Sequence, residues 1–396
     1  MIRAFSELVN VQENELERIF NFWIKNTIDQ KNGGFVGTIL GDGTVIKNAP
    51  KGAILNGRIL WSFSAAYIYT KNEKYLEMAK RAYEYFINFF VDKKNGGVFW
   101  ELDATGKPLN TRKQAYAQGF AIYGLSEYYK ATGNKKSLEI AQEIFWTIEK
   151  YYFDKEYGGY IEALSEDWKP LDDMRLSAKE ANWPKSMNTH LHILEPYTNL
   201  YRCWKNPILA KSINRIVRIF LDQIINQQTA HFNLLFDYDW SVKTSTISFG
   251  HDIEGSWLLT EAAEELDDDA LIEEVKKVAV RMVDVTLEQG TDTDGSVFNE
   301  SEEGHIDKDK HWWPQAEAMV GYVNAWQITG NRKYLDEAEK VWNFIDLHLI
   351  DHENGEWFWR VDTDGRPYPE EEKVGFWKCP YHNSRALIEV CTRLKK

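Results

Sequence analysis

The stretch DKKNGGVFWELDATG, residues 92–106, is the clearest indication of the fold because it recurs along the chain. Its Gly-Gly pair, the alternating residues that follow and its closing glycine are typical of a β-hairpin, since glycine adopts positive φ without strain. Strong copies begin at Asp29, Asp154 and Asp351, and weaker copies begin at His231 and Thr291. Most successive copies begin 60 to 63 residues apart, and the copy between Asp154 and His231 is longer. This recurrence indicates a repeat architecture.

Helical segments lie in pairs between these hairpins. Residues 75–90, 137–152 and 334–349 carry apolar side chains at three- and four-residue spacing. More apolar partners precede them at 59–69, 119–130 and 319–328. Six hairpins and about twelve helices predict an all-α fold, an (α/α)6 barrel of six inner and six outer helices with short β-hairpins in the loops. An open solenoid of helix pairs is the alternative, but six repeats without a polar terminal cap favour closure.

Composition limits the partners. No Pro/Ser-rich linker divides the 396 residues, so we expect a single catalytic domain over 1–396. The net charge of −14 argues against nucleic acid and anionic membranes, whereas 16 tryptophans suggest stacking on sugar rings. The N-terminus lacks a signal-peptide core, no window reaches 18 apolar residues, and the three cysteines have no metal-like spacing. These features predict a reduced, cytoplasmic setting.

Four of the nine histidines, His190, His192, His251 and His382, lie near the starts of expected inner helices, where such barrels place their clefts. A lone histidine is usually a satisfied core residue, but the shared placement in separate repeats favours a joint role. His251 and Glu254 stand at i, i+3, so we expect the carboxylate beside the imidazole. The remaining histidines, His231, His305, His311, His348 and His352, have weaker contexts.

Several chemistries lack their motifs. The sequence contains no HExxH, no Cys/His metal framework, no nucleophile elbow and no phosphate or dinucleotide loop, so we expect neither a metal nor a cofactor. A glycoside hydrolase needs a pair of carboxylic acids, and the spacing of Asp252, Glu254 and Glu317 singles out no pair. A histidine-based isomerase instead moves a proton α to a carbonyl near neutral pH, and the histidine pattern favours it. A sugar-binding module is a third interpretation.

Five stretches carry a resemblance to a known family. They are KGAILNGRILWSFSAAY (51–67), KSMNTHLHILEPYTNLYR (185–202), SFGHDIEGSWLL (248–259), WWPQAEAMVGYVNAW (312–326) and WKCPYHNSRALIEV (377–390). Together they resemble the cellobiose 2-epimerases, which are (α/α)6 barrels of the N-acylglucosamine 2-epimerase superfamily. The likeness runs in order from end to end of the chain.

The resemblance implies an isomerase that interconverts reducing-end glucose and mannose units of β-1,4-linked disaccharides without metal or nucleotide. By the same resemblance, His251 and His382 are the acid/base pair at C2, and His192 assists ring opening. The implied substrate-binding residues are Arg58, Tyr116, Glu180, Asn188, Glu254, Trp313 and Trp377, with Trp312 as an alternative to Trp313. The substrate stays open among cellobiose, mannobiose, lactose and free mannose. Aldose–ketose isomerisation and N-acylglucosamine epimerisation are alternative reactions, and the protein is expected to be a monomer or a weak homo-oligomer.

Overall fold

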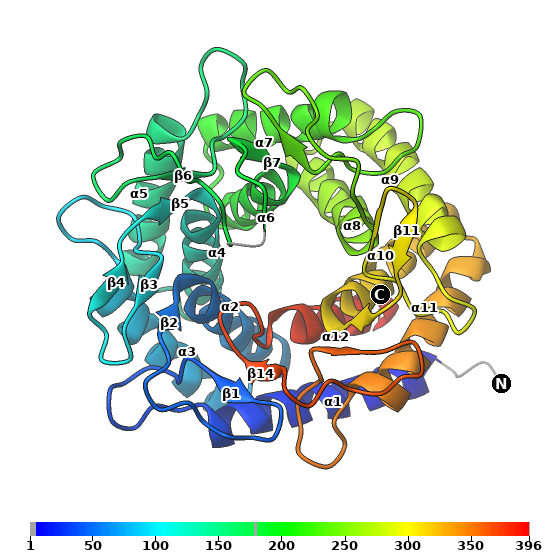
Figure 1. The fold of residues 1–396 in the computed structure, drawn as a ribbon, viewed down its shortest axis with the longest axis horizontal. Helices are drawn as coiled ribbons and strands as arrows, with labels where there is room; N and C mark the ends of the chain where they lie inside the picture. The colour runs from blue at the N-terminus through cyan, green and yellow to red at the C-terminus, as the bar shows by residue number, and fades with distance from the viewer. Residues whose placement is uncertain (1–4, 178–179, 396) are drawn as a thin grey trace.

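The computed structural model describes residues 5–177 and 180–395 and confirms the (α/α)6 barrel predicted from the repeats (Figure 1). The inner helices are α2 (Ala53–Thr70), α4 (Ala115–Thr132), α6 (Met187–Cys203), α8 (Phe249–Leu266), α10 (Trp312–Thr329) and α12 (Tyr381–Lys395). The outer helices are α1 (Phe5–Asn26), α3 (Glu73–Tyr85), α5 (Lys135–Tyr151), α7 (Pro207–Ile219), α9 (Asp269–Gln289) and α11 (Arg332–Phe344). The π-helical turns η1 (Phe86–Phe90), η2 (Phe220–Ile224) and η3 (Ile345–Leu349) extend α3, α7 and α11.

Local chemistry explains the two classes of helix. Outer helices bury one stripe, as α7 does with Leu209, Ile213 and Ile216. Inner helices are buried nearly all round, and α2 is buried continuously from Ala53 to Ala66. Most outer helices start at a capping side chain that accepts a hydrogen bond from a first-turn N–H group. These caps are Asn72, Asn134, Asn206, Asp268 and Asn331.

The barrel closes on itself. Each inner helix contacts the next, and α12 contacts α2. The first outer helix, α1, packs against α12, so the two ends of the chain complete the sixth helix pair (Figure 1). Strand β14 (Glu372–Val374) pairs with β1 (Ile39–Leu40) across the same seam. This closure excludes the open solenoid.

All six expected hairpins are present, and each is tied to a neighbouring repeat. A short strand before each inner helix pairs with a strand of the following hairpin, and β14 with β1 is the sixth such pair. The others are β2 (Lys51–Gly52) with β3 (Glu101–Leu102), β5 (Lys113–Gln114) with β6 (Ala163–Leu164), β7 (Lys185–Ser186) with β8 (Leu235–Phe236), β9 (Ile247–Ser248) with β10 (Glu300–Glu302), and β12 (Lys310–His311) with β13 (Arg360–Val361). Strands β4 (Pro108–Asn110) and β11 (His305–Asp307) add to β3 and β10.

Five lysine–aspartate ion pairs, which we call hairpin locks, join the strand before an inner helix to the preceding hairpin. They are Lys51–Asp29, Lys113–Asp92, Lys185–Asp154, Lys310–Asp292 and Lys373–Asp351. Their lysines are buried, and their aspartates are buried or half-buried. In the fourth repeat, Asn226 and Ile247 occupy the two positions, so both charges are absent together. A buried charge is costly without its partner, which explains why neither charge occurs alone.

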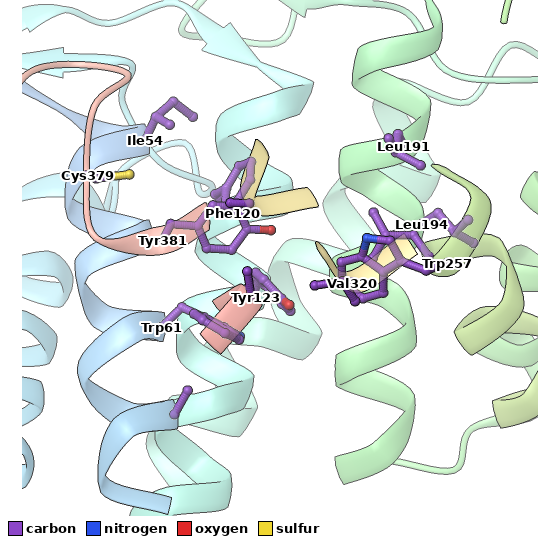
Figure 2. Packing of buried hydrophobic residues seen from close by; sticks show 14 of the residues in the cluster. Ile54, Trp61, Phe120, Tyr123, Leu191, Leu194, Trp257, Val320, Cys379 and Tyr381 are labelled. Carbon is purple, nitrogen blue, oxygen red and sulfur yellow. The ribbon is translucent and has the colours of Figure 1, made fainter. Parts of the chain in front are cut away.

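Aromatic side chains fill the middle of the barrel. Trp61 on α2 stacks on Tyr123 of α4 at 5.2 Å between ring centroids and meets Tyr381 of α12 edge-on at 5.4 Å (Figure 2). The interior is therefore a packed core rather than a continuous channel. Among the residues described, no helix combines the length and apolarity needed to cross a bilayer.

Candidate active site

The ten residues proposed from the sequence line one cavity of about 610 Å³ at the barrel end where the inner helices begin. They are Arg58, Tyr116, Glu180, Asn188, His192, His251, Glu254, Trp313, Trp377 and His382. Sequence reasoning did not assign the remaining lining residues to a site, apart from Trp312 as an alternative: these are Ser177, His311, Trp312, Trp359 and Glu372. The volume lies in the range of small-molecule sites.

His251 lies between a hydroxyl and an indole. Its Nδ1 is 2.7 Å from Ser248 Oγ, and its ring is 4.6 Å from that of Trp313. The expectation that Glu254 pairs with this imidazole is wrong. Glu254 Oε1 accepts a hydrogen bond from Arg385 at 2.7 Å, because α12 brings a guanidinium to it from the other end of the chain.

The other two histidines have carboxylate partners. His382 Nδ1 lies 2.6 Å from Glu317 Oε1, and His192 Nδ1 lies 3.1 Å from Glu195 Oε2. A partner at Nδ1 fixes the ring orientation and the tautomer. Within the described residues, no protein hydrogen bond reaches Nε2 of His192, His251 or His382. All three rings therefore keep Nε2 for a molecule in the cavity.

Arg385 joins the carboxylates behind these rings. One terminal nitrogen donates to Glu254 at 2.7 Å and to Glu317 at 2.6 Å, and the other donates to Glu195 and Tyr381. Sequence reasoning missed Arg385 and Glu195. A signal for Glu195 existed, since it stands at i+3 from His192, the spacing applied to His251. Arg385 also stands at i+3 from His382, but nothing local identifies its partners.

The surroundings shift the pKa values of these groups in opposite directions. Burial, with His192 and Arg58 nearby, lowers the pKa of His251 to about 3. Burial, with Arg58 and Arg385 nearby, holds the pKa of His382 well below its ordinary value. Burial and the neighbouring Glu317 carboxylate raise the pKa of Glu254 to about 7. Near neutral pH, His251 and His382 are therefore uncharged and able to accept a proton.

Among the described residues that line the cavity, the buried polar atoms without a hydrogen-bond partner in the protein include Glu254 Oε2, Asn188 Oδ1 and Arg58 Nε. Buried polar atoms are normally paired, so these acceptors and this donor suit a ligand rich in hydroxyl groups. Arg58 also donates to Tyr116 Oη at 3.0 Å, which fixes the guanidinium at the cavity wall.

Two other histidines from the sequence have structural roles. His190 Nε2 accepts from the Tyr160 backbone N–H at 2.9 Å, and its Nδ1 lies 2.7 Å from the Ser186 carbonyl oxygen. His231 Nδ1 lies 2.7 Å from Asp252 Oδ2, and this pair holds the fourth hairpin. Asp252 is thereby engaged outside the cavity lining.

One set of described side chains, Glu254, Glu317 and His382, brings three potential metal-ligand atoms within 4.8 Å of one another. Arg385 donates to both carboxylates of this set. The guanidinium thus already supplies the positive charge that two adjacent buried carboxylates require. We therefore interpret the cluster as an ion-pair network that orients His382.

Comparison with known proteins assigns the family. The model of N-acylglucosamine 2-epimerase (GlcNAc 2-epimerase) matches residues 33–386. The chain belongs to this family. It is 48% identical over 382 residues to the cellobiose 2-epimerase of Bacteroides fragilis, covering 96% of this chain and 97% of the relative. It is 39% identical to the cellobiose 2-epimerase of Dictyoglomus turgidum, covering 95% and 96%.

A solved structure agrees with family membership. The cellobiose 2-epimerase of Bacillus thermoamylovorans B4167 superposes with a TM-score of 0.94 at 37% identity, covering 98% of this chain and all of that chain. Membership in the N-acylglucosamine 2-epimerase family confirms the resemblance inferred from the five stretches and the class of carbohydrate epimerase, an isomerase. It does not assign a role to any single residue.

Proposed function

We propose that this protein interconverts the reducing-end glucose and mannose units of β-1,4-linked disaccharides, with cellobiose as the first substrate to test. The observation that carries the proposal is the convergence of three imidazoles, each engaged at Nδ1, on one cavity. Relatives named cellobiose 2-epimerase, one of them 48% identical over nearly the whole chain, support this substrate class.

The chemistry follows from the groups in the cavity. His192 assists opening of the hemiacetal ring, which exposes the C1 aldehyde and makes the C2 proton acidic. One of His251 and His382 removes that proton, and the electron pair of the C–H bond moves into an enediolate. The Arg58 guanidinium stabilises the charge that develops on oxygen. Return of a proton to the opposite face of C2 gives the epimer, and return to C1 gives a ketose as a side product.

A hydrolase fits the same cavity less well. Glycoside hydrolysis needs two carboxyl groups with oxygens free to act on the sugar. Glu317 has its Oε1 engaged by Arg385 and His382 and its Oε2 engaged by the Trp257 indole at 3.1 Å. Of these two carboxyl groups, only Glu254 has an oxygen without a partner in the protein. Glu254 and Glu317 thus do not form a hydrolytic pair.

The proposal is tested by incubating the protein in D₂O with cellobiose, mannobiose, mannose and N-acetylmannosamine and following each sugar by NMR. We expect deuterium at C2 of cellobiose together with the appearance of glucosyl-mannose. Exchange with another of the four sugars alone would reassign the substrate. Release of glucose without C2 exchange, or no exchange with any sugar, would overturn the epimerase function.

A further inference from the structure

The serine that precedes α8 has an unusual partner. Ser248 is the N-cap residue of α8, where a serine hydroxyl normally accepts a first-turn backbone N–H. It makes no such cap bond, and its Oγ instead contacts His251 Nδ1 at 2.7 Å. In α6, by contrast, Ser186 at the same position accepts from the Thr189 backbone N–H at 3.0 Å. The hydroxyl of Ser248 is thus used for a side chain rather than for the helix.

We propose that Ser248 is a positioning residue for the C2 chemistry, which holds the His251 ring so that Nε2 faces the cavity. This inference rests on the proposed epimerase function. Ser248 is itself held in place, since it is only 6% exposed and its backbone pairs with Glu300 in the β9–β10 ladder. The Trp313 indole packs on the imidazole at 4.6 Å. The ring is therefore fixed by a hydroxyl and by an aromatic face.

The neutral partner distinguishes this histidine from the other two. His382 and His192 face the carboxylates of Glu317 and Glu195, which stabilise an imidazolium strongly. A hydroxyl stabilises the imidazolium much less. Ser248 therefore gives His251 a neutral partner at Nδ1, and the hydroxyl still accepts the Nδ1–H when the ring takes the C2 proton at Nε2.

The other groups that face His251 either disfavour a positive charge on its ring or carry no charge that contacts it. Arg58 from α2 and His192 from α6 disfavour a positive charge on it. His382 from α12 lies near enough to feel its charge, and Trp313 from α10 is uncharged. Glu254, on α8 itself, is bound to Arg385. A substitution of Ser248, the partner at Nδ1, is therefore expected to change the basicity of the His251 imidazole.

The test compares three variants on the sugar that exchanges at C2. We expect Ser248→Ala to lower kcat about 10- to 100-fold, the range for loss of an outer partner that orients a histidine, with little change in KM. Ser248→Thr keeps the hydroxyl and should retain most activity. Ser248→Asp places a carboxylate at Nδ1 and should move the acidic limb of the kcat/KM profile to higher pH. A merely structural serine would not move that limb.

Asn206→Ala is the matched control, because Asn206 caps the outer helix α7 away from the cavity. It should lower the melting temperature and leave kcat unchanged. If the wild type is active and a folded Ser248→Ala variant has a kcat within twofold of the wild-type value, the inference about Ser248 is overturned and the proposed function is not. If Ser248→Ala does not fold, an unmoved pH limb in Ser248→Asp overturns it. If the wild type exchanges no deuterium at C2 of any of the sugars, both the proposed function and this inference are overturned.

Discussion

At the scale of residues, the charge of each histidine's partner differentiates three similar side chains. Glu195 and Glu317 contact His192 and His382, whereas His251 contacts a neutral hydroxyl. Arg385 binds Glu195, Glu317 and Glu254, so three buried carboxyl groups share one cation. The Glu195 pKa shows the balance: burial would raise it, yet Arg385 and His192 bring it down to about 2. Under the proposed function, the imidazoles and not Glu195 transfer the proton.

Replacing His382 by asparagine should nearly abolish turnover. Asparagine keeps a polar contact to Glu317 but cannot exchange a proton, and acid/base groups typically contribute about 10²–10⁴-fold. Initial rates of C2 epimerisation, with folding checked by circular dichroism, measure the loss. His305→Asn, on the exposed strand β11, is the control and should behave as wild type. A folded His382→Asn protein with more than a few per cent of activity would show that His382 is not an acid/base group.

Glu162 gives a prediction on pH and stability. This carboxyl is buried beside Ser186 and Thr189, and burial raises its pKa from 4.5 to about 8. The folded state therefore holds a proton that the unfolded state releases, so this stabilisation is complete below pH 4.5 and is lost as pH rises through 8. Glu162→Gln has no carboxyl group to titrate and therefore does not lose stability in this way. Its free energy of unfolding relative to wild type should increase by a few kcal/mol between pH 5 and 8.5, at about 1.4 kcal/mol per pKa unit.

Urea unfolding at several pH values measures that difference. Exposed Glu143 on α5 provides the control, since Glu143→Gln should give a difference that does not change with pH. A Glu162→Gln advantage that stays constant from pH 5 to 8.5 would mean that Glu162 is ionised at the lower pH in the folded protein.

At the scale of elements, the hairpin lock explains how short strands hold long helices. Each lock joins the strand before an inner helix to the preceding hairpin. In four of the five locks the lysine also donates to a backbone oxygen, as Lys113 does to Gly96. Strands of two or three residues have too few hydrogen bonds to be stable alone. The locks add a charged contact at the end of the barrel where the cavity lies.

A double substitution tests this element. Lys113→Ile alone leaves Asp92 buried without its cation and should cost about 3–5 kcal/mol of unfolding free energy. Asp92→Asn with Lys113→Ile copies Asn226 and Ile247 of the fourth repeat and should recover most of the loss. The control is the exposed Lys277–Glu273 pair on α9, whose removal should change the free energy of unfolding little. Additive losses in the Asp92/Lys113 double variant, measured by urea unfolding, would contradict the lock.

At the scale of the whole molecule, the chain ends close the ring next to the cavity. Trp23 of α1 donates to Glu356 of the sixth hairpin, and Glu356 in turn binds Lys378 at 2.9 Å and Asn383 at 2.7 Å. Lys378 and Asn383 flank His382 in the sequence. The N-terminal helix therefore supports the segment that presents this histidine.

Trp23→Ala should destabilise the protein by about 3–5 kcal/mol, because Trp23 is fully buried, and should also reduce kcat through the His382 segment. Trp23→Phe keeps most of the packing but leaves Glu356 without one donor, so a smaller loss of about 1–3 kcal/mol is expected. Trp146→Ala, at a tryptophan that is 43% exposed on α5, serves for comparison and should change kcat little. Equal effects of the Trp23 and Trp146 truncations would contradict the coupling between closure and site.

Much of the fold could be predicted because its signals are local. The hairpins and the apolar stripes of the helices each depend on residues close together in the sequence, and six copies of the unit of hairpin and helix pair predict a barrel. The histidines at inner-helix starts could be grouped for the same reason, since equivalent positions of a closed repeat meet at one end. The pairing of Glu254 with His251 failed because helical spacing shows which residues share a face and not which partner competes for them.

The repeat, the two classes of helices and the end of the barrel that carries the candidate site can be predicted from the sequence, because hydrogen bonding and apolar periodicity are encoded over short distances. The partners of the site residues follow from the packing of the whole chain, since Arg385 with Glu195 and Glu254, and Glu317 with His382, are joined across many tens of residues. Closure of the ring brings α6, α8, α10 and α12 around one buried point, where each carboxylate pairs with the nearest opposite charge. These pairings depend on distances in space, which no local sequence pattern contains.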